Sequence, residues 1–322
     1  MPLIILILAV MISLVQLEYV VALAEYKSFS TAADKCYVTQ PTLSMQIKKM
    51  ENDLDTILFD RSKKPVTPTD IGYKIVEQAK IILSETAQID ELVQIDKQTL
   101  AGELRVGIIP SISPYLLPNF IGEFAKKYPH LHITIKELLS EEIMDAIDSN
   151  QIDIGILATP LPRDGYNINP LFYEKILLYC NENHDFATKK TIDLKQMKDQ
   201  NIWLMSNGNC FRNQAMNLCE LKEEEDKSSF RYESASIETL IKLVDIEGGI
   251  TLIPELAITS LPPNKQKNIK SFKNIVPVRE VSVINNRIFV KKRMIEVLIE
   301  AIKSNLNSEM LDSNRGEIVE WT

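Results

Sequence analysis

The chain has 322 residues, of which 45% are hydrophobic and 25% are charged, so it is long enough for two or three compact domains. Its formal net charge of −8 excludes a protein that binds nucleic acid through overall positive charge, although a local basic patch is compatible with it. Four cysteines are too few for a disulfide scaffold in a chain of this length, and they predict a cytoplasmic protein with reduced thiols.

The first fifteen residues, MPLIILILAVMISLV, form an apolar run without the features of a signal peptide or a membrane span. No Lys or Arg precedes Lys27, and the run is shorter than the roughly 20 residues that a span needs. We therefore expect residues 1–10 to lie upstream of the true start at Met11. A membrane anchor and a buried helix extension are the alternatives.

The segment 11–68 has the pattern of a winged helix-turn-helix. Apolar residues repeat at helical spacing from Leu14 to Tyr26, and a second short helix follows, for which we expect Ser30 to be the N-cap. Thr39 is expected to cap a third helix. The same pattern also fits a helical hairpin with a solvated face.

The outer face of the third helix carries polar and cationic side chains, which are the types that reach base edges and phosphates. The segment that follows, FDRSKKPVTPT, is basic and suits a wing that touches the DNA backbone. Residues 27–64 hold seven Lys or Arg against five Asp or Glu, although the whole chain is acidic. The candidate DNA-binding residues are Ser30, Thr39, Gln40, Pro41, Thr42, Ser44, Gln46, Lys48, Arg61, Lys63 and Lys64.

Residues 69–98 are predicted to form one long linker helix that pairs with a second copy as a coiled coil. The apolar seam has alternating spacings of four and three, at Ile75, Ala79, Ile82, Thr86, Ile89 and Val93. A stripe this narrow needs a partner helix, so we expect a dimer that places two DNA-binding heads on two half-sites. The alternative is a helix that packs only on its own domain.

After a hinge at residues 99–103, alternating strands and helices predict a two-lobed α/β regulatory domain over residues 104–307. The cleft between two such lobes is the usual place for a ligand. A loose polar tail is expected over residues 308–322. The predicted boundaries are 104–174 with 275–307 for lobe I, and 175–274 for lobe II.

The segment NCFRNQAMNLC places Cys210 and Cys219 at the two ends of one predicted helix. The helix dipole and the nearby Arg212 both favour the thiolate of Cys210, whereas the acidic run after Cys219 should raise the pKa of that thiol. Across an intact helix the two Cα atoms would lie about 13 Å apart, beyond the roughly 7 Å that a disulfide tolerates. A disulfide therefore requires the helix to unwind. The alternative is a buried Cys219 beside an idle Cys210.

Three features together resemble the LysR-type transcriptional regulators: SFSTAADKCYVTQPTLSMQIKKMENDLDTILFDR, the long linker helix and GGITLIP. The resemblance covers residues 11–306. It implies a DNA-binding transcriptional regulator rather than an enzyme, with a regulatory domain similar to periplasmic binding proteins. It also implies a tetramer, contact with RNA polymerase, and no cofactor or metal.

Within that family, the cysteine segment is similar to that of the hydrogen-peroxide-sensing members. The similarity implies that Cys210 is the peroxidatic thiol and Cys219 the resolving one. Two departures remove ionisable groups beside the thiol, because Asn209 and Asn213 stand where these members often have His and Asp. The supporting residues that the resemblance implies for a peroxide pocket are Ser111, Ser140, Asn209, Arg212 and Asn213.

Two other functions compete with a peroxide sensor. A LysR-type regulator that binds a small metabolite between its lobes would have incidental cysteines. A thiol peroxidase is disfavoured because half of the chain is devoted to a DNA-binding head, a coiled coil and a second lobe. The sequence has no nucleotide-binding glycine motif, and its three histidines have no matching ligand cluster.

Overall fold

The structure is a computed structural model that describes residues 12–96, 100–198, 200–221, 236–286 and 291–321. The chain divides into two compact units with a boundary between residues 98 and 99, and each unit is described by itself. The expectation about residues 1–10 lies outside the described residues. Over the ranges described, no helix is both long and apolar enough to cross a membrane.

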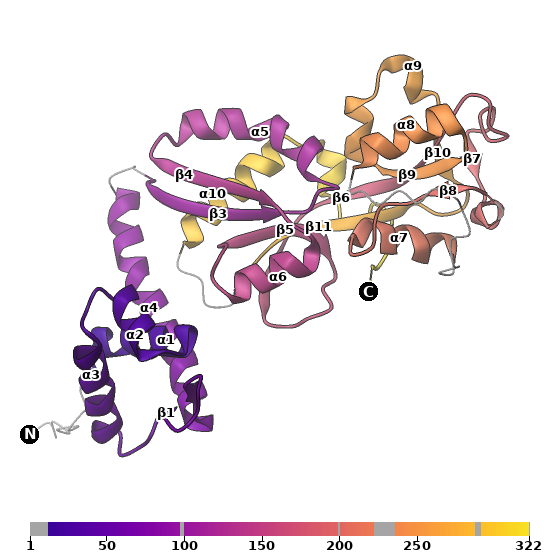
Figure 1. Ribbon diagram of the computed structural model, residues 1–322. Helices are drawn as coiled ribbons and strands as arrows, with labels where there is room; N and C mark the ends of the chain where they lie inside the picture. Colours follow the sequence, from indigo (N-terminus) through magenta and orange to yellow (C-terminus); the bar gives the residue numbers. More distant parts are fainter. Residues whose placement is uncertain (1–11, 97–99, 199, 222–235, 287–290, 322) are drawn as a thin grey trace, which may run out of the picture. The chain divides into compact units, whose positions relative to one another are not determined.

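The first unit has the helices and the two-stranded wing of a winged helix-turn-helix (Figure 1). Strands β1 and β2 pair antiparallel and form the wing. The core includes Leu23, Leu43, Ile47 and Leu58, none of which is exposed. In chain order the elements are α1 (Leu14–Tyr26), α2 (Phe29–Lys35), α3 (Gln40–Asp53), β1 (Phe59–Asp60), β2 (Thr67–Pro68) and α4 (Asp70–Asp96).

Side-chain caps set the starts of the three short helices. Ser13 forms a capping box with Gln16, and the Thr39 hydroxyl accepts a hydrogen bond from the Thr42 amide, as predicted for the third helix. The predicted cap of α2 is wrong. Ser28 takes the extended backbone of an N-cap and its hydroxyl accepts the Thr31 amide, so Ser30 lies exposed inside the first turn.

A single carboxylate fastens the wing to α3. One oxygen of Glu51 accepts hydrogen bonds from the amides of Leu58 and Phe59, at 2.9 and 3.3 Å. Its other oxygen pairs with Arg61 at 2.7 Å. Because Glu51 is only 8% exposed, the position of the wing depends on these contacts.

The seam of the linker helix α4 is divided between two environments. Ala79 is buried and Ile75 is partly buried against the core of the first unit, so the first turns pack on their own domain. Farther along, Ile82 and Ile89 are 39% and 60% exposed. The start of α4 therefore packs on its own domain, as the alternative prediction had it. For the rest of α4, pairing with the linker helix of a second copy stays a prediction.

The second unit is built on one continuous mixed sheet with strand order β4-β3-β5-β11-β6-β10-β7 (Figure 1). In the first part of this unit, α5 and α10 cover one face of the sheet and α6 covers the other. Its elements are β3 (Gly102–Ile108), α5 (Ser113–Lys127), β4 (Leu131–Glu137), α6 (Ser140–Asp148), β5 (Ile154–Thr159), β11 (Pro277–Asn286) and α10 (Lys292–Ser304).

The second lobe is built on the last third of the long strand β6 (Tyr166–Cys180). Strand β6 pairs with β11 through residues 166–175 and with β9 and β10 through residues 176–180. The predicted lobe boundary at residues 174 and 175 therefore falls inside this strand. The other elements are β7 (Thr191–Ile192), η1 (Leu194–Met197), β8 (Ile202–Trp203), α7 (Cys210–Cys219), α8 (Ile237–Glu247), β9 (Ile250–Pro254), η2 (Glu255–Ser260), α9 (Pro263–Gln266) and β10 (Ile269–Phe272).

Two expectations at the ends of the regulatory domain need correction. The predicted hinge at 99–103 includes Gly102 and Glu103, which already belong to β3. The tail is not loose, because it forms η3 (Ser308–Leu311) and β12 (Glu317–Ile318), which pairs parallel with β11. The tail is ordered because three of its apolar side chains, Met310, Val319 and Trp321, are buried.

Replacing Glu51 with Ala should destabilise the first unit by about 2 kcal/mol, because it leaves two buried amides without an acceptor. Urea unfolding followed by hydrogen exchange of peptides from residues 40–68 measures this loss. Glu77→Ala is the control, since Glu77 pairs with Lys80 on an exposed helix surface and should cost less than about 0.5 kcal/mol. Equal effects of the two substitutions would contradict this role of Glu51.

Candidate functional site

Helix α7 carries the two cysteines singled out in the sequence at its first and last positions. Its N-cap is Asn209, which has an extended backbone, but the Asn209 side chain donates to Ser206 instead of capping the helix. The C-cap of the helix is Glu220, which has a left-handed backbone conformation. Cys210 and Cys219 are each only 2% exposed, and both are free thiols.

The helical conformation keeps the two thiols apart. Nine residues at about 1.5 Å rise separate the two Cα atoms by about 13 Å, and about 100° of rotation per residue places the side chains on opposite sides of α7. Disulfides form only at Cα separations below about 7 Å. In this conformation α7 is therefore incompatible with a Cys210–Cys219 bond.

The Cys210 thiol is buried among polar groups of Arg279, Ser140 and the Ala158 backbone, and we call this set of groups the thiol pocket. The pKa of this thiol is raised above its ordinary value, because burial outweighs the positive charge of Arg279 and the polar contacts with Ser140 and with the backbone of Ala158, all of which lower it. The Ser140 hydroxyl is buried and forms no hydrogen bond of regular geometry among the described residues. The pocket thus combines a thiol, a cation and a hydroxyl that can bind a small polar molecule.

Arg279 is the buried cation of this pocket. It comes from β11, has no exposed surface, and its guanidinium lies 4.8 Å from the ring centre of Phe211, the residue after Cys210. Its Nη1 and Nη2 atoms donate to the hydroxyl and the carbonyl of Ser111, at 2.9 and 3.1 Å. Arg279 therefore links Ser111 to the start of α7.

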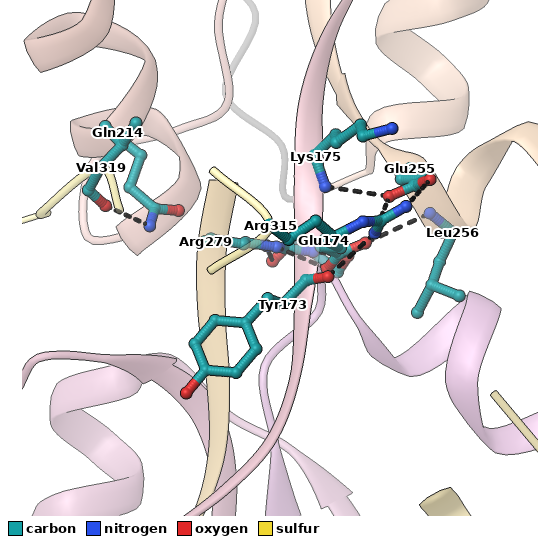
Figure 2. A network of polar contacts seen from close by, with 10 residues as sticks. Tyr173, Glu174, Lys175, Gln214, Glu255, Leu256, Arg279, Arg315 and Val319 are labelled. Atoms are coloured by element: carbon teal, nitrogen blue, oxygen red, sulfur yellow. Dashed lines mark hydrogen bonds and ion pairs between the residues drawn. The ribbon is translucent and has the colours of Figure 1, made fainter. Parts of the chain in front are cut away.

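Glu174 of β6 balances the charge of Arg279. Its Oε1 accepts from Arg279 Nε at 2.6 Å, and its Oε2 accepts from the Leu256 amide at 3.2 Å (Figure 2). Glu174 is fully buried, which raises the pKa of its carboxyl group, and Arg279 lowers that pKa. A buried pair of this kind is held by its hydrogen bonds, and removing one partner leaves an uncompensated charge.

The five predicted supporting residues differ in their hydrogen-bond partners. Ser111 is bound to Arg279, Ser140 contacts the thiol, and Asn209 directly precedes Cys210. Arg212 instead donates to the carbonyl of Met205, and Asn213 donates to the carbonyl of Trp321. The cation that acts on the Cys210 thiol is therefore Arg279 and not Arg212.

Arg279 and Glu174 were missed in the sequence, although each leaves a signal there. Glu174 stands beside Lys175 in LFYEKILLYC and Arg279 beside Glu280 in VPVREVSV, so a pair of charges interrupts each otherwise apolar strand. A charge inside a buried strand needs a partner, and two opposite charges of this kind indicate that the strands are neighbours.

Among the described residues, no charge lowers the pKa of Cys219, in contrast to Cys210. Burial raises the pKa of Cys219 to about 12. The acidic run after Cys219, which the sequence predicts to raise this pKa, lies mostly outside the described residues. The asymmetry between the two thiols is therefore explained by burial and by Arg279.

The candidate DNA-binding residues lie on α2, on α3 and on the wing of the first unit. Gln40, Pro41 and Lys48 of α3 are exposed, while Thr42 and Ser44 are partly buried. Two further exposed side chains were missed in the sequence, since Tyr37 in the turn before α3 is 95% exposed and Met45 on α3 is 65% exposed.

Several predicted DNA contacts already have partners within the first unit. Gln46 accepts a hydrogen bond from Gln16 at 3.3 Å. Arg61 is paired with Glu51 and Lys63 lies 3.5 Å from Asp60, whereas Lys64 is exposed. Arg61 therefore holds the wing in place before any ligand binds.

The described part of the chain contains no group of three His, Cys, Asp or Glu side chains that could hold a metal ion. The polar groups that converge on Cys210 are hydrogen-bond donors and a cation. They suit a small anion or a small neutral molecule.

Comparison with known proteins identifies two domains of the LysR family. Residues 14–73 match the bacterial regulatory helix-turn-helix protein of the lysR family, and residues 97–307 match the LysR substrate binding domain. A hydrogen peroxide-inducible genes activator of Haemophilus influenzae is 35% identical over 79% of this chain and 83% of its own length. The Escherichia coli K12 dual regulator OxyR is 32% identical over 90% of this chain and 95% of its own.

The fold is also similar to a solved OxyR structure from another bacterium. A full-length OxyR variant from Pseudomonas aeruginosa superimposes with a TM-score of 0.67 and 32% identity, over 91% of this chain and 95% of the other. The expectation of a helix-turn-helix head joined to an α/β regulatory domain is thereby confirmed.

Removing the Arg279 charge should raise the pKa of Cys210, because the buried thiolate loses its cation. We expect the pH profile of Cys210 alkylation by iodoacetamide to move up by about one pH unit in an Arg279→Met, Glu174→Met double variant. The paired change avoids leaving Glu174 buried and uncompensated. Arg212→Met is the control and should leave the profile unchanged. A shift in the control alone would contradict the assignment of Arg279.

Substitutions on α3 should separate base contacts from phosphate contacts. Lys48→Ala should weaken binding to all duplexes alike. It should also reduce the slope of log K against log salt concentration by about 1, because one phosphate contact is lost. Gln40→Ala should relax base preference at one position, at a cost of about 1–3 kcal/mol for the preferred sequence. Binding to duplexes selected from a random library, with exposed Lys126→Ala of the second unit as control, measures both. Identical salt slopes and base preferences in all variants would contradict this surface.

Proposed function

The chain belongs to the LysR family of bacterial transcriptional regulators, and from this premise we propose that it senses hydrogen peroxide through reversible formation of a Cys210–Cys219 disulfide. As a member of that family it is a DNA-binding regulator and not an enzyme. The single observation that carries the proposal is the pocket around Cys210, in which a buried cation and an unsatisfied hydroxyl meet a thiol. The name of the Haemophilus influenzae relative, a hydrogen peroxide-inducible activator, supports the same signal.

The first step oxidises Cys210. The thiolate sulfur attacks one oxygen of hydrogen peroxide, an S–O bond forms, and the O–O bond breaks. The departing hydroxide takes up a proton and leaves as water, and Cys210 becomes a sulfenic acid. Arg279 stabilises the thiolate, and the Ser140 hydroxyl donates a hydrogen bond to the peroxide. Ser111 keeps Arg279 in position through its hydroxyl and its carbonyl.

The second step closes the disulfide. The Cys219 sulfur attacks the Cys210 sulfur, an S–S bond forms, and the S–O bond breaks with release of a second water. One peroxide and two thiols thus give one disulfide and two waters. Because Cys219 has a raised pKa and lies at the far end of α7, it can attack only after the helix unwinds.

Unwinding of α7 connects the chemistry to DNA. The disulfide prevents α7 from re-forming, so oxidation replaces one conformation of the second lobe with another. In a tetramer this change would alter the surfaces between regulatory domains and the spacing of the DNA-binding heads. A different spacing would select different half-sites and a different contact with RNA polymerase.

A small metabolite as the signal is the alternative. Arg279 and Ser111 lie between β11 and the start of α5, and they could hold a small anion without any change in α7. Such a regulator would bind its effector reversibly and would respond equally after Cys219→Ser.

The proposal is tested by mass spectrometry after brief exposure to stoichiometric hydrogen peroxide. The wild-type protein should form a Cys210–Cys219 disulfide within seconds, and Cys219→Ser should accumulate a sulfenic acid on Cys210. Cys210→Ser should do neither. Cys180→Ser is the control, because Cys180 is buried away from the pocket and its loss should change nothing. Slow oxidation of all four cysteines at similar rates would overturn the proposal and favour the metabolite.

A further inference from the structure

We infer that the C-terminal residues 317–321 are a strap that holds α7 in its helical form and thereby limits how fast Cys219 reaches Cys210. This inference rests on the proposed disulfide switch and adds to it the element that opposes the switch. The strap lies within residues 308–322, which the sequence predicts to be a loose tail.

Three amide side chains on one side of α7 bind three consecutive carbonyls of the strap. Gln214 donates to Val319 at 2.8 Å (Figure 2). Asn213 donates to Trp321 and Asn217 donates to Glu320, both at 3.0 Å, so the middle of α7 is tied to the strap. Gln214 has no exposed surface, and its hydrogen bond therefore does not compete with water.

The strap is in turn fixed to the central sheet. Strand β12 pairs with the start of β11, and beyond it the Val319 amide donates to the carbonyl of Val278 at 2.8 Å. The Trp321 ring is buried, and its Nε1 donates to the carbonyl of Ala158 in β5 at 3.0 Å. Ala158 also presents its backbone to the Cys210 sulfur. The strap therefore joins α7 to the strand that forms the wall of the thiol pocket.

A buried ion pair anchors the strap just before β12. Arg315 makes two hydrogen bonds to Glu255, at 2.5 and 2.7 Å, and one to the carbonyl of Tyr173 at 3.0 Å (Figure 2). Its side chain is 7% exposed, and a paired Arg–carboxylate contact of this geometry is both strong and directional. Because Tyr173 precedes Glu174 in β6, the anchor sits beside the partner of Arg279.

These contacts oppose the unwinding of α7. The amides of residues 213, 214 and 217 face one row of carbonyls only while their backbone is helical, so unwinding must separate them from the strap. The strap cannot follow the helix, since it is paired with β11 and held by Arg315 and Trp321. Release of the strap contacts is therefore part of the step that brings Cys219 to the Cys210 sulfenic acid.

The test compares the full chain with Asn217→Ala and with a chain that ends at Gly316. Asn217→Ala removes one strap contact and raises the intrinsic helix propensity of α7, which by itself would slow unwinding. Conversion of the Cys210 sulfenic acid into the disulfide should nevertheless be about threefold faster in this variant, and about tenfold faster in the shortened chain. Glu320→Gln is the matched control, because the Glu320 side chain is exposed and only its carbonyl is used.

Hydrogen exchange of the α7 amides in the reduced proteins provides a second readout that needs no oxidation. Protection should fall in the order wild type, Asn217→Ala, shortened chain, while the rate of sulfenic acid formation in Asn217→Ala stays the same as in the wild type. Unchanged disulfide rates in both variants would overturn the inference, even if protection fell. If the wild-type protein forms no disulfide, the proposed function fails, and the strap is then supported or rejected by the reduced-state protection alone.

Discussion

A disulfide cannot bridge the two ends of an intact ten-residue helix, and the account of this protein depends on that geometric constraint. The reduced state needs α7 as a helix because its first residue is then placed in the pocket of Arg279 and Ser140. The oxidised state needs the same residues in another conformation. Oxidation therefore exchanges one structure for another instead of adding a bond to an existing one.

The pocket and the strap share the same region of the central sheet. Strand β11 supplies Arg279 and also pairs with β12, while β6 supplies Glu174 and the carbonyl that accepts from Arg315. The charged groups around the thiol thus belong to the central sheet, and α7 is the part that must change. A buried charge pair is costly to rearrange, so the movement is confined to the helix and its hydrogen bonds to the strap.

The sequence predicted the fold well because each element is locally specified. Caps, apolar spacing and short turns mark the helix-turn-helix, and alternating strands and helices mark the regulatory domain. It also singled out Cys210 and Cys219 as candidates, and the family resemblance added Ser111 and Ser140, whose roles stay predictions. It did not identify Arg279, because the partner of a buried charge is set by strand pairing across more than a hundred residues of chain. The strap was missed because 308–322 is mostly polar, and its order depends on a few buried side chains and on backbone carbonyls.

Hydrogen exchange of residues 209–221 in the reduced and the peroxide-oxidised wild-type protein tests the central claim most directly. The account predicts that the α7 amides are protected in the reduced protein and lose that protection once the Cys210–Cys219 disulfide has formed. A protein that contains this disulfide and keeps full protection of α7 would contradict the claim that the helix must unwind.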